Sequence, residues 1–514
     1  MQPFLLIHPP IAKGCEPPAG IARLAGTLQQ AGIPRRVLDA NLEGQLHLLG
    51  QTPEAADTWT RRALNSRNRH LAALRTFDTY RAPARHVRTV SDLNRLLAMA
   101  GQAVGASVGL ADYQQNPLSP LRSADLLIAA EHPERNPFHP WFSQRLPELL
   151  TGVRIVGLSL NYLSQALCTF AMAGCIRRQA PGVKIVLGGG LVTSWLQRPG
   201  WQNPFAGLID HLIAGPGEEA LLALCGAAPP TGGDALPDYA ALPLADYLAP
   251  GLILPYSAAS GCYWHNCSFC PERAEGNPYR PLPVSQALQE LHVLCDRYRP
   301  TLVHLLDNAV SPALLRALAA HPLPMPWYGF ARIDAQLADP DFCRALRRSG
   351  CVMLKLGLES GDQGVLDLLH KGIDLDMAAT TLKNLKAAGI AVYGYLLFGT
   401  PAEDEAAARR TLEFVVRHGD SIDFLNVALF NMPMGASEAG DYGTAPFYDG
   451  DLSLYTDFCH PRGWARQQVR RFISGEFSRQ PAVAAILRRD PLLFTSNHAP
   501  LFAMAGQRNP LEHT

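Results

Sequence analysis

The sequence predicts an α/β protein made of a doubly wound, Rossmann-like parallel sheet, a linker, a partial (β/α)6 barrel and a C-terminal helical cap. Three observations lead to this fold class. Short apolar segments alternate with helical periodicity over residues 1–225, a Pro- and Gly-rich stretch follows at 226–251, and six further strand–helix repeats occupy 252–430. Regular alternation of strands and helices is typical of parallel sheets covered by helices. Residues 431–514 are expected to form the cap.

The first domain opens with a buried strand at residues 4–8, which Pro9 and Pro10 end. Apolar residues at helical spacing from 19 to 31 predict a helix that stops at Gly32. The same alternation then predicts strands near 37–39, 155–159, 184–187 and 210–213, and a helix over 166–177. A sheet of this kind binds ligands at the carboxyl ends of its strands.

A long insertion at about 45–150 interrupts the first domain and is rich in arginine. An insertion of this length is usually a lid, a docking surface or a small helical subdomain. Arginines on a helix most often form a solvated face, and contact with a substrate or partner is the alternative. The linker interpretation of 226–251 depends on its composition, including the run from Pro229 to Gly233.

The second domain is predicted from a repeat of strands and helices. Strands are expected near 252–256, 302–306, 327–330, 353–356, 393–397 and 424–427, and helices near 284–298, 311–321, 339–349, 375–389 and 402–417. Six such units make about three-quarters of a (β/α)8 barrel, whose chemistry lies at the C-terminal ends of the strands. Those ends hold Asp307, Arg332, Glu359, Ser360 and Gly399.

Length and composition limit the protein class. The 514 residues are 47% hydrophobic and 18% charged, which fits two or three globular domains. Equal numbers of basic and acidic residues, 45 each, count against nucleic acid as a partner. The first residues do not resemble a signal peptide, and no run approaches the ~20 apolar residues that cross a bilayer. Eleven cysteines with only three clustered favour a reduced, cytoplasmic protein without a membrane partner.

The three clustered cysteines, Cys262, Cys267 and Cys270, have the spacing C-x4-C-x2-C and follow the first strand of the second domain. Cysteine thiolates hold iron–sulfur clusters, and a four-iron cluster normally takes four of them. The next cysteine, Cys295, lies inside a predicted helix, so a cluster here keeps one iron open for another ligand. A structural Cys3His zinc site that includes His265 is one alternative. A disulfide or a buried set of thiols is another.

The cysteine loop resembles the cluster loop of the radical SAM superfamily, whose usual spacing is C-x3-C-x2-C with an aromatic residue before the third cysteine. Phe269 takes the aromatic position, and one extra residue separates the first two cysteines. The resemblance implies a [4Fe-4S] cluster whose open iron binds S-adenosylmethionine, and reductive cleavage of that molecule to a 5'-deoxyadenosyl radical. Together with the strand ends, it implies that Phe269, Asp307, Arg332, Glu359, Ser360 and Gly399 bind S-adenosylmethionine.

The glycine-rich strand ends of the first domain resemble the cobalamin-binding domain that precedes the cluster domain in one large radical SAM class. In that class Ser159, Gly188, Gly189 and Gly217 would line the corrin and its nucleotide tail. The motif D-x-H-x-x-G is absent, and its nearest match has Asn41 where the histidine would stand. We therefore expect no histidine of this motif to coordinate cobalt. A degenerate domain that binds nothing is the alternative.

The C-terminal region is expected to be helical over 451–492 and to end its ordered part at 494–499. His498 is a candidate acid or base, although a lone histidine in a helical tail is more often a surface or capping residue.

Taken together, the motifs predict a cobalamin-dependent radical SAM enzyme that methylates an unactivated carbon of a small molecule or peptide. Its expected partner is an electron donor such as flavodoxin or ferredoxin. One alternative is a cobalamin-binding radical enzyme that rearranges or cyclises its substrate without methylation. The other is a binding protein whose cluster senses redox state or iron.

Overall fold

The structure is a computed structural model of the chain and describes residues 3–52, 57–198, 200–228, 235–447 and 449–506. The chain divides into two compact units. Unit 1 comprises the described residues within 1–76, 84–252 and 448–454, and unit 2 comprises those within 77–83, 253–447 and 455–514. The Pro- and Gly-rich run that suggested a linker, 229–233, lies outside the described residues.

Unit 1 is built on a five-stranded parallel sheet in the order β2-β1-β5-β6-β7. Its strands are β1 (Phe4–His8), β2 (Arg35–Asp39), β5 (Ile155–Ser159), β6 (Lys184–Gly188) and β7 (His211–Leu212). All five residues of β1 are buried, as expected for a strand inside a parallel sheet. Helix α1 (Ala19–Gln30) packs Ile21 and Leu28 into the same cluster as Phe4 and Leu6. The predicted parallel α/β sheet is confirmed.

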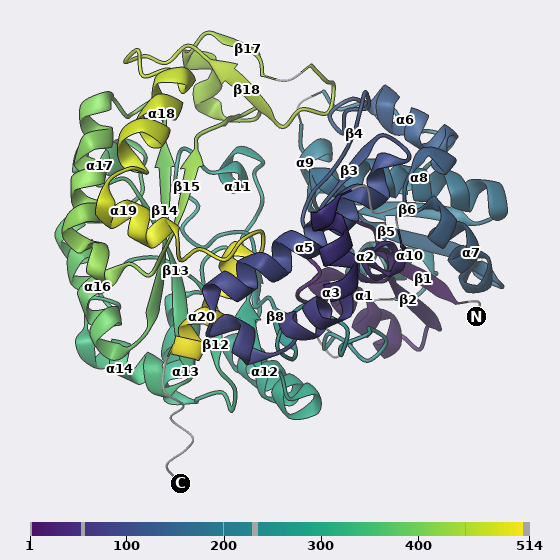
Figure 1. Cartoon of the computed structure of the whole chain (residues 1–514), viewed down its shortest axis with the longest axis horizontal. Coiled ribbons are helices and arrows are strands. Elements are labelled where there is room, and N and C mark those ends of the chain that lie inside the picture. Colours follow the sequence, from purple (N-terminus) through teal and green to yellow (C-terminus); the bar gives the residue numbers. More distant parts are fainter. Residues whose placement is uncertain (1–2, 53–56, 199, 229–234, 448, 507–514) are drawn as a thin grey trace. The chain divides into compact units, whose positions relative to one another are not determined.

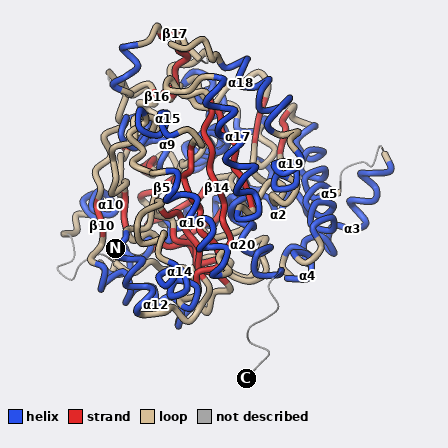
Figure 2. The backbone as a smooth tube through the Cα atoms, turned by 90° about the vertical axis from the view of Figure 1, so that its left-hand side faces the viewer, coloured by secondary structure: helices blue, strands red, loops and turns tan. Residues whose placement is uncertain are grey.

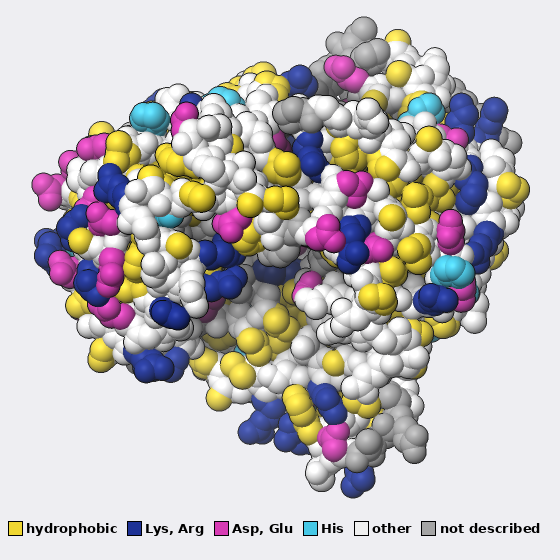
Figure 3. Space-filling view, turned by 90° about the horizontal axis from the view of Figure 1, so that it is seen from above, with side chains coloured by type: hydrophobic (Ala, Val, Ile, Leu, Met, Phe, Trp, Pro, Cys, Tyr) yellow, Lys and Arg dark blue, Asp and Glu magenta, His cyan; other side chains and the backbone are white. Residues whose placement is uncertain are grey.

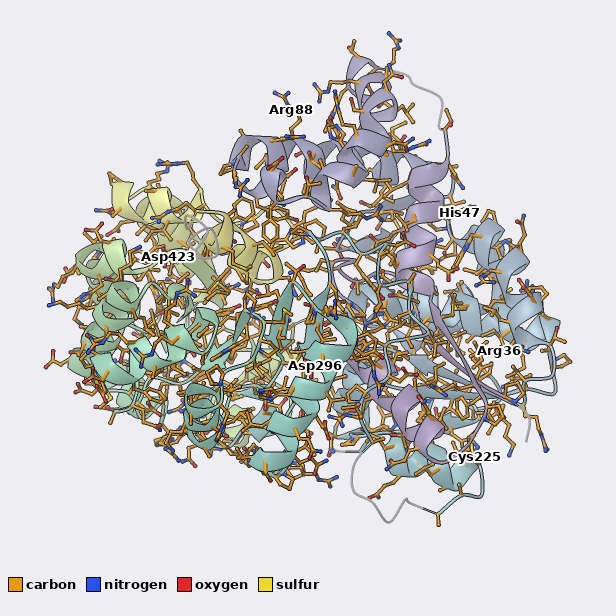
Figure 4. All side chains as sticks on the ribbon, turned by 90° about the horizontal axis from the view of Figure 1, so that it is seen from below. Arg36, His47, Arg88, Cys225, Asp296 and Asp423 are labelled. Atoms are coloured by element: carbon orange, nitrogen blue, oxygen red, sulfur yellow. The ribbon has the colours of Figure 1, made fainter. Side chains whose placement is uncertain are left out.

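The remaining elements of unit 1 are mostly helices. They are α2 (Ala40–Gly50), α3 (Thr58–Leu74), α5 (Pro83–Gln102), β3 (Ala106–Val108), β4 (Tyr113–Gln115), α6 (Ser123–Glu131), α7 (His139–Leu150), α8 (Leu163–Gln179), α9 (Gly190–Leu196) and α10 (Glu218–Leu224). Strands β3 and β4 pair antiparallel within the helical insertion. Most arginines of α3 and α5 are exposed, whereas Arg67 and Arg95 are partly buried, and Arg88 points outward into solvent (Figure 4). This exposure agrees with a solvated face.

Unit 2 is built on a six-stranded parallel sheet in the order β8-β11-β12-β13-β14-β15. The strands are β8 (Ile253–Tyr256), β11 (Leu302–Leu305), β12 (Trp327–Ala331), β13 (Cys351–Glu359), β14 (Ala391–Phe398) and β15 (Phe424–Leu429). The helices between them are α12 (Val284–Tyr298), α13 (Pro312–Ala320), α14 (Pro340–Arg348), α15 (Gln363–Leu368), α16 (Leu375–Ala388) and α17 (Glu405–His418). Helices α14, α16 and α17 lie over the strands in Figure 2. The partial barrel is confirmed, and α15 is an addition that the sequence did not predict.

Side chains that cap the helices of unit 2 determine where those helices begin. A side-chain oxygen just before each of five helices accepts a backbone N–H of the first turn, which has no partner inside the helix. These caps are Ser311, Asp339, Asp362, Asp374 and Asp404. Four of these caps end a loop that follows a strand and so fix the length of that loop at the carboxyl edge of the sheet, whereas Asp374 ends the turn between α15 and α16.

The C-terminal region differs from the helix expected over 451–492. It contributes to a three-stranded antiparallel sheet in the order β16-β18-β17, made of β16 (Met432–Pro433), β17 (Thr444–Pro446) and β18 (Tyr455–Phe458). The two helices that follow are short, α18 (Arg466–Phe472) and α19 (Pro481–Leu487). The prediction of one helical stretch was wrong because Tyr455, Thr456 and Phe458 favour a strand.

Helix α20 (Thr495–Gly506) continues past 494–499, where the ordered part was expected to end. It contacts β13 and β14 and lies across the sheet from α16 (Figure 1). His498 was expected at the surface or at a cap, but it is fully buried. Its ring stacks on Phe494, and its Nδ1 lies 3.2 Å from Tyr80 Oη of α4 (Phe77–Tyr80).

No helix in the described part of the chain is long and apolar enough to cross a membrane. Acidic and basic side chains are interspersed over the face seen in Figure 3, in keeping with a formal net charge of zero.

Candidate functional site

The cysteine loop is closed at its base by a short antiparallel pair. Strand β9 (Ala259–Ser260) follows β8 and pairs with β10 (Arg280–Pro281), so that residues 261–279 form a loop at the carboxyl end of β8. Gly261 has φ +73°, and a Cβ at this position would lie 2.5 Å from the carbonyl oxygen of Pro278. Only glycine fits this closure without moving the backbone. All three cysteines of the loop are free thiols.

The turn that follows α15 holds the cysteine loop from one side. Ser268 N donates to Leu369 O at 3.1 Å, and Trp264 Nε1 donates to His370 O at 3.1 Å. The Trp264 ring lies against Gly372, where an added Cβ would approach the ring to 2.3 Å. Two hydrogen bonds and one close contact therefore fix the path of the loop. Trp264 was not among the predicted site residues, although an aromatic residue between the cysteines was a signal.

Two cations lie beside the most buried cysteine of the loop. Arg332 Nη1 is 3.9 Å from Cys267 Sγ, and its guanidinium lies 4.1 Å from the centre of the Trp264 ring. Burial raises the pKa of Cys267, while the charges of Lys371 and Arg332 act to lower it. Burial raises the pKa of Cys270 to about 11. A thiol must lose its proton to bind a metal, so the cations favour the form that a cluster requires.

The donor chemistry of the loop fits an iron–sulfur cluster better than a mononuclear zinc site. His265, the fourth ligand of the Cys3His alternative, is exposed. Within the described ranges, no three His, Cys, Asp or Glu side chains come close enough to share one metal ion. Zinc needs four ligands on a single ion, whereas cluster thiolates bind different irons and need not converge on one point.

A buried ion pair lies at the end of β13. Lys371 Nζ is 2.7 Å from Glu359 Oε1, and the two side chains are 8% and 12% exposed. The ammonium also lies 5.6 Å from the centre of the Phe269 ring, the aromatic residue before the third cysteine. Glu359 has φ +60°, an uncommon backbone conformation for this residue. Glu359 and Lys371 therefore come together with Phe269 of the cysteine loop.

Two other predicted site residues make contacts within the protein. Asp307 Oδ2 accepts the backbone N–H of Ala258 at 3.1 Å, which ties β11 to the start of the cysteine loop. Burial raises the pKa of Asp307 to about 6. The Ser360 hydroxyl lies 3.1 Å from Thr411 Oγ1 and accepts the N–H of Asp362. These contacts explain the positions of both residues, and their binding of a cofactor stays a prediction.

Gly399, at the end of β14, is held by a buried carboxylate. Its N–H donates to Glu403 Oε2, which also accepts Trp464 Nε1 at 3.0 Å. Glu403 is fully buried, and burial raises its pKa to about 7. Glu403 was not among the predicted site residues, because nothing in the local sequence indicates that its carboxylate is buried.

The raised pKa of Glu403 predicts a pH-dependent stability. The folded protein favours the protonated form of Glu403. Its contribution to the free energy of unfolding is therefore fully present below the ordinary pKa of 4.5 and is lost as the pH rises through about 7. A pKa shift of this size corresponds to a change of about 3 kcal/mol in the free energy of unfolding. We expect Glu403→Gln, which mimics the protonated acid, to be more stable than the wild type at pH 8 but not at pH 4.5. Urea unfolding at both pH values measures this difference, and an equal difference at the two values would contradict it.

The predicted ligand edge of unit 1 lies at the carboxyl ends of β5 and β6. Ser159 Oγ accepts Asn161 Nδ2 at 3.1 Å, and Gly188 ends β6. Gly189 has φ +110°, and a Cβ there would lie 2.4 Å from Leu160 O. The close approach of the loop after β5 therefore requires glycine at this position, whether or not a ligand binds.

Two further residues bear on the cobalamin interpretation. Gly217 precedes α10, and a Cβ there would lie 3.3 Å from Leu24 Cδ2. Asn41, at the position of the absent histidine, is 2% exposed. Its Oδ1 accepts the N–H of Ala12 at 2.8 Å and Gln45 Nε2 at 2.7 Å. Asn41 thus connects the loop after β1 to α2.

A partial parallel barrel with three free thiols on the loop after its first strand is the arrangement of a radical SAM domain. Residues 256–415 match the family model of the Radical SAM superfamily. This part of the chain is a radical SAM domain.

Two curated relatives are methyltransferases by name. An uncharacterized methyltransferase of Pyrococcus horikoshii is 25% identical over 187 residues, which cover 35% of this chain and 40% of the relative. Bacteriochlorophyllide d C-12(1)-methyltransferase of Chlorobaculum tepidum is 26% identical over 176 residues, covering 32% of this chain and 38% of the relative. The chain thus spans less than half the length of these curated relatives.

The fold also resembles that of a solved enzyme. The radical S-adenosylmethionine methyltransferase TsrM from Kitasatospora setae, with cobalamin and a [4Fe-4S] cluster bound, has a TM-score of 0.53 at 15% identity. The match covers 87% of this chain and 81% of TsrM. At this identity the likeness is one of fold.

Proposed function

We propose that this protein is a cobalamin-dependent radical SAM enzyme that transfers a methyl group to an unactivated carbon of a small molecule or peptide. The observation that carries the proposal is the set of three free thiols at the carboxyl end of β8, beside Arg332 and Lys371. The radical SAM domain, the methyltransferase names of both curated relatives and the fold shared with TsrM support it.

Cys262, Cys267 and Cys270 would hold the [4Fe-4S] cluster, which when bound supplies the electron for cleavage of S-adenosylmethionine. Arg332 and Lys371 stabilise the Cys267 thiolate by placing positive charge near its sulfur. The carboxylate of Glu359 accepts hydrogen bonds, so it is suited to the ammonium or ribose hydroxyls of S-adenosylmethionine.

The remaining predicted residues divide between the two cofactors. We assign the S-adenosylmethionine pocket to Phe269 of the cysteine loop and to the strand ends that carry Asp307, Arg332, Glu359, Ser360 and Gly399. We assign cobalamin, which when bound supplies the methyl carrier, to the carboxyl edge of the unit 1 sheet. Its strand order changes direction between β1 and β5, and such a switch point is the usual ligand site of an open parallel sheet. Ser159 and Gly188 end β5 and β6, and Gly189 and Gly217 follow β6 and β7.

A turnover experiment without substrate tests the proposal. The protein is reconstituted anaerobically with iron and sulfide, incubated with cobalamin, S-adenosylmethionine and dithionite, and its products are quantified by mass spectrometry. We expect 5'-deoxyadenosine together with S-adenosylhomocysteine, and neither in the sample without dithionite. Deoxyadenosine alone would favour a radical reaction without methylation. The absence of both products with a verified cluster would overturn the enzyme assignment.

A further inference from the structure

The turn that follows β14 is held by a segment of the C-terminal region. The turn comprises residues 399–404 and begins at Gly399, which has φ +81°. The segment comprises residues 460–469, which follow β18 and run into α18. Both belong to unit 2. His460 and Thr400, which join them, lie 60 positions apart along the chain, so only the fold brings the two parts together.

His460 makes the first contact, and its hydrogen bonds determine which ring nitrogen carries the proton. Its Nδ1 accepts the backbone N–H groups of Arg462 at 3.2 Å and Trp464 at 3.3 Å. A neutral imidazole has one acceptor nitrogen and one N–H, so the proton lies on Nε2. Nε2 donates to the carbonyl oxygen of Thr400 at 2.8 Å. Burial lowers the pKa of His460, which favours this neutral ring.

Trp464 makes the second contact through a carboxylate of the turn. Its Nε1 donates to Glu403 Oε2 at 3.0 Å, and the same oxygen accepts the N–H of Gly399. Trp464 is 5% exposed and Glu403 is fully buried. A hydrogen bond in such surroundings is electrostatically stronger than one in water. Trp464 therefore acts on the backbone of Gly399 through the Glu403 carboxylate.

Two weaker contacts join the same two parts of the chain. Val469 packs against the backbone of Gly399, where an added Cβ would lie 3.2 Å from Val469 Cγ2. Arg462 Nη1 lies 3.4 Å from Asp404 Oδ2, and this exposed ion pair contributes little. Gly399 itself keeps a partly exposed surface. The segment thus fixes the turn while part of Gly399 stays accessible to a ligand.

We propose that His460 and Trp464 are positioning residues for S-adenosylmethionine, which hold the turn after β14 in the conformation that binds this molecule. The inference rests on the proposed function, which assigns Gly399 to the S-adenosylmethionine site, and it adds the C-terminal region to the parts on which that site depends. Glycine adopts many backbone conformations with similar ease. A turn that is fixed before binding loses less conformational freedom when the ligand binds, so affinity is higher.

The test measures the binding of S-adenosylmethionine to the anaerobically reconstituted full chain by calorimetric titration without a reductant. Two variants of His460 separate the roles of its two nitrogens. The amide oxygen in His460→Asn replaces Nδ1 as an acceptor, but the bond to Thr400 is lost. The amide N–H in His460→Gln replaces Nε2 and keeps that bond. We expect His460→Asn to weaken binding about fivefold, the worth of one net hydrogen bond, and His460→Gln to retain the wild-type affinity.

Trp464→Phe tests the second contact and keeps the test valid if His460→Asn disturbs the fold. Phenylalanine keeps an aromatic ring and removes the N–H that binds Glu403, so we again expect binding about fivefold weaker. The matched control is Gln468→Ala. Gln468 Nε2 donates to Gly463 O at 3.0 Å within the 460–469 segment, so its loss removes neither contact to the turn. This variant should bind S-adenosylmethionine as the wild type does.

Kinetics and iron content distinguish positioning from a general structural role. In His460→Asn and Trp464→Phe we expect the KM for S-adenosylmethionine in deoxyadenosine formation to rise about fivefold, with kcat and iron content unchanged. A loss of iron in step with the loss of affinity would assign the effect to the cluster and overturn the proposal. Equal losses in His460→Asn and His460→Gln would overturn the role of the bond to Thr400.

The titration also separates this inference from the proposed function. Wild-type affinity in both His460→Asn and Trp464→Phe would overturn the positioning role and leave the enzyme assignment intact. If the wild type with a verified cluster binds no S-adenosylmethionine, both proposals are overturned.

Discussion

Replacement of Cys267 by alanine is expected to reduce the cleavage of S-adenosylmethionine to the level of a reaction without enzyme. Cys267 is the most buried of the three loop cysteines, and Arg332 contacts its sulfur. Two thiolates cannot replace three in holding a cluster that already has an open iron. The measurement is 5'-deoxyadenosine by mass spectrometry after anaerobic reconstitution, together with the iron content of the variant.

The matched control for this experiment is Cys225→Ala. Cys225 is a free, partly exposed thiol at the end of α10 (Figure 4) and lies outside the cysteine loop. We expect this variant to keep the iron content and the deoxyadenosine yield of the wild type. Cleavage retained in Cys267→Ala at wild-type iron content would show that the loop does not hold the reactive cluster.

The sheets and most helices were predictable because their signals are local. A run such as 4–8 is apolar throughout, and the helices of the barrel follow a period of about 3.6 residues between polar caps. The caps Asp339, Asp374 and Asp404 stand where the sequence shows a helix start. The short helix α15 was missed because its six residues are too few to show a period.

The cysteine loop could be recognised from sequence, but its environment could not. Spacing alone identifies Cys262, Cys267 and Cys270, since the three lie within nine positions of one another. The contact of Arg332 with Cys267 joins residues 65 positions apart, and Trp264 bonds to His370 across 106 positions. No local pattern encodes such distances, and only the barrel brings these loops together.

The predicted site residues differ in how the structure explains them. Glu359, predicted from a strand end, and Phe269, predicted from the cysteine loop, both lie around Lys371, so two separate predictions lead to one cluster. Asp307 and Ser360 instead make hydrogen bonds that hold neighbouring backbone. Both kinds of residue stand at a strand end, and a sequence does not distinguish a residue that supports a loop from one that faces a ligand.

Glu359→Gln is expected to destabilise unit 2 by about 3–5 kcal/mol, because it leaves the ammonium of Lys371 buried without its counter-charge. The measurement is urea unfolding of the whole protein, and hydrogen exchange of peptides from β13 and α15 then measures the loss locally. The double variant Glu359→Gln with Lys371→Met removes the buried charge as well, so it should recover most of the lost stability. Such recovery separates the loss of an ion pair from general damage to the strand end.

The control for the Glu359 variants is an ion pair of the same chemistry on the surface of unit 2. Lys386 Nζ lies 3.2 Å from Asp423 Oδ1, with the two side chains 50% and 20% exposed, and Asp423 is seen in Figure 4. Because solvent screens this pair, Lys386→Met should change the free energy of unfolding by less than about 1 kcal/mol. A Glu359→Gln effect no larger than that of Lys386→Met would mean that Lys371 is solvated in the folded protein. In that case the strand end of β13 would not provide the dry, charged surface that the proposed S-adenosylmethionine site requires.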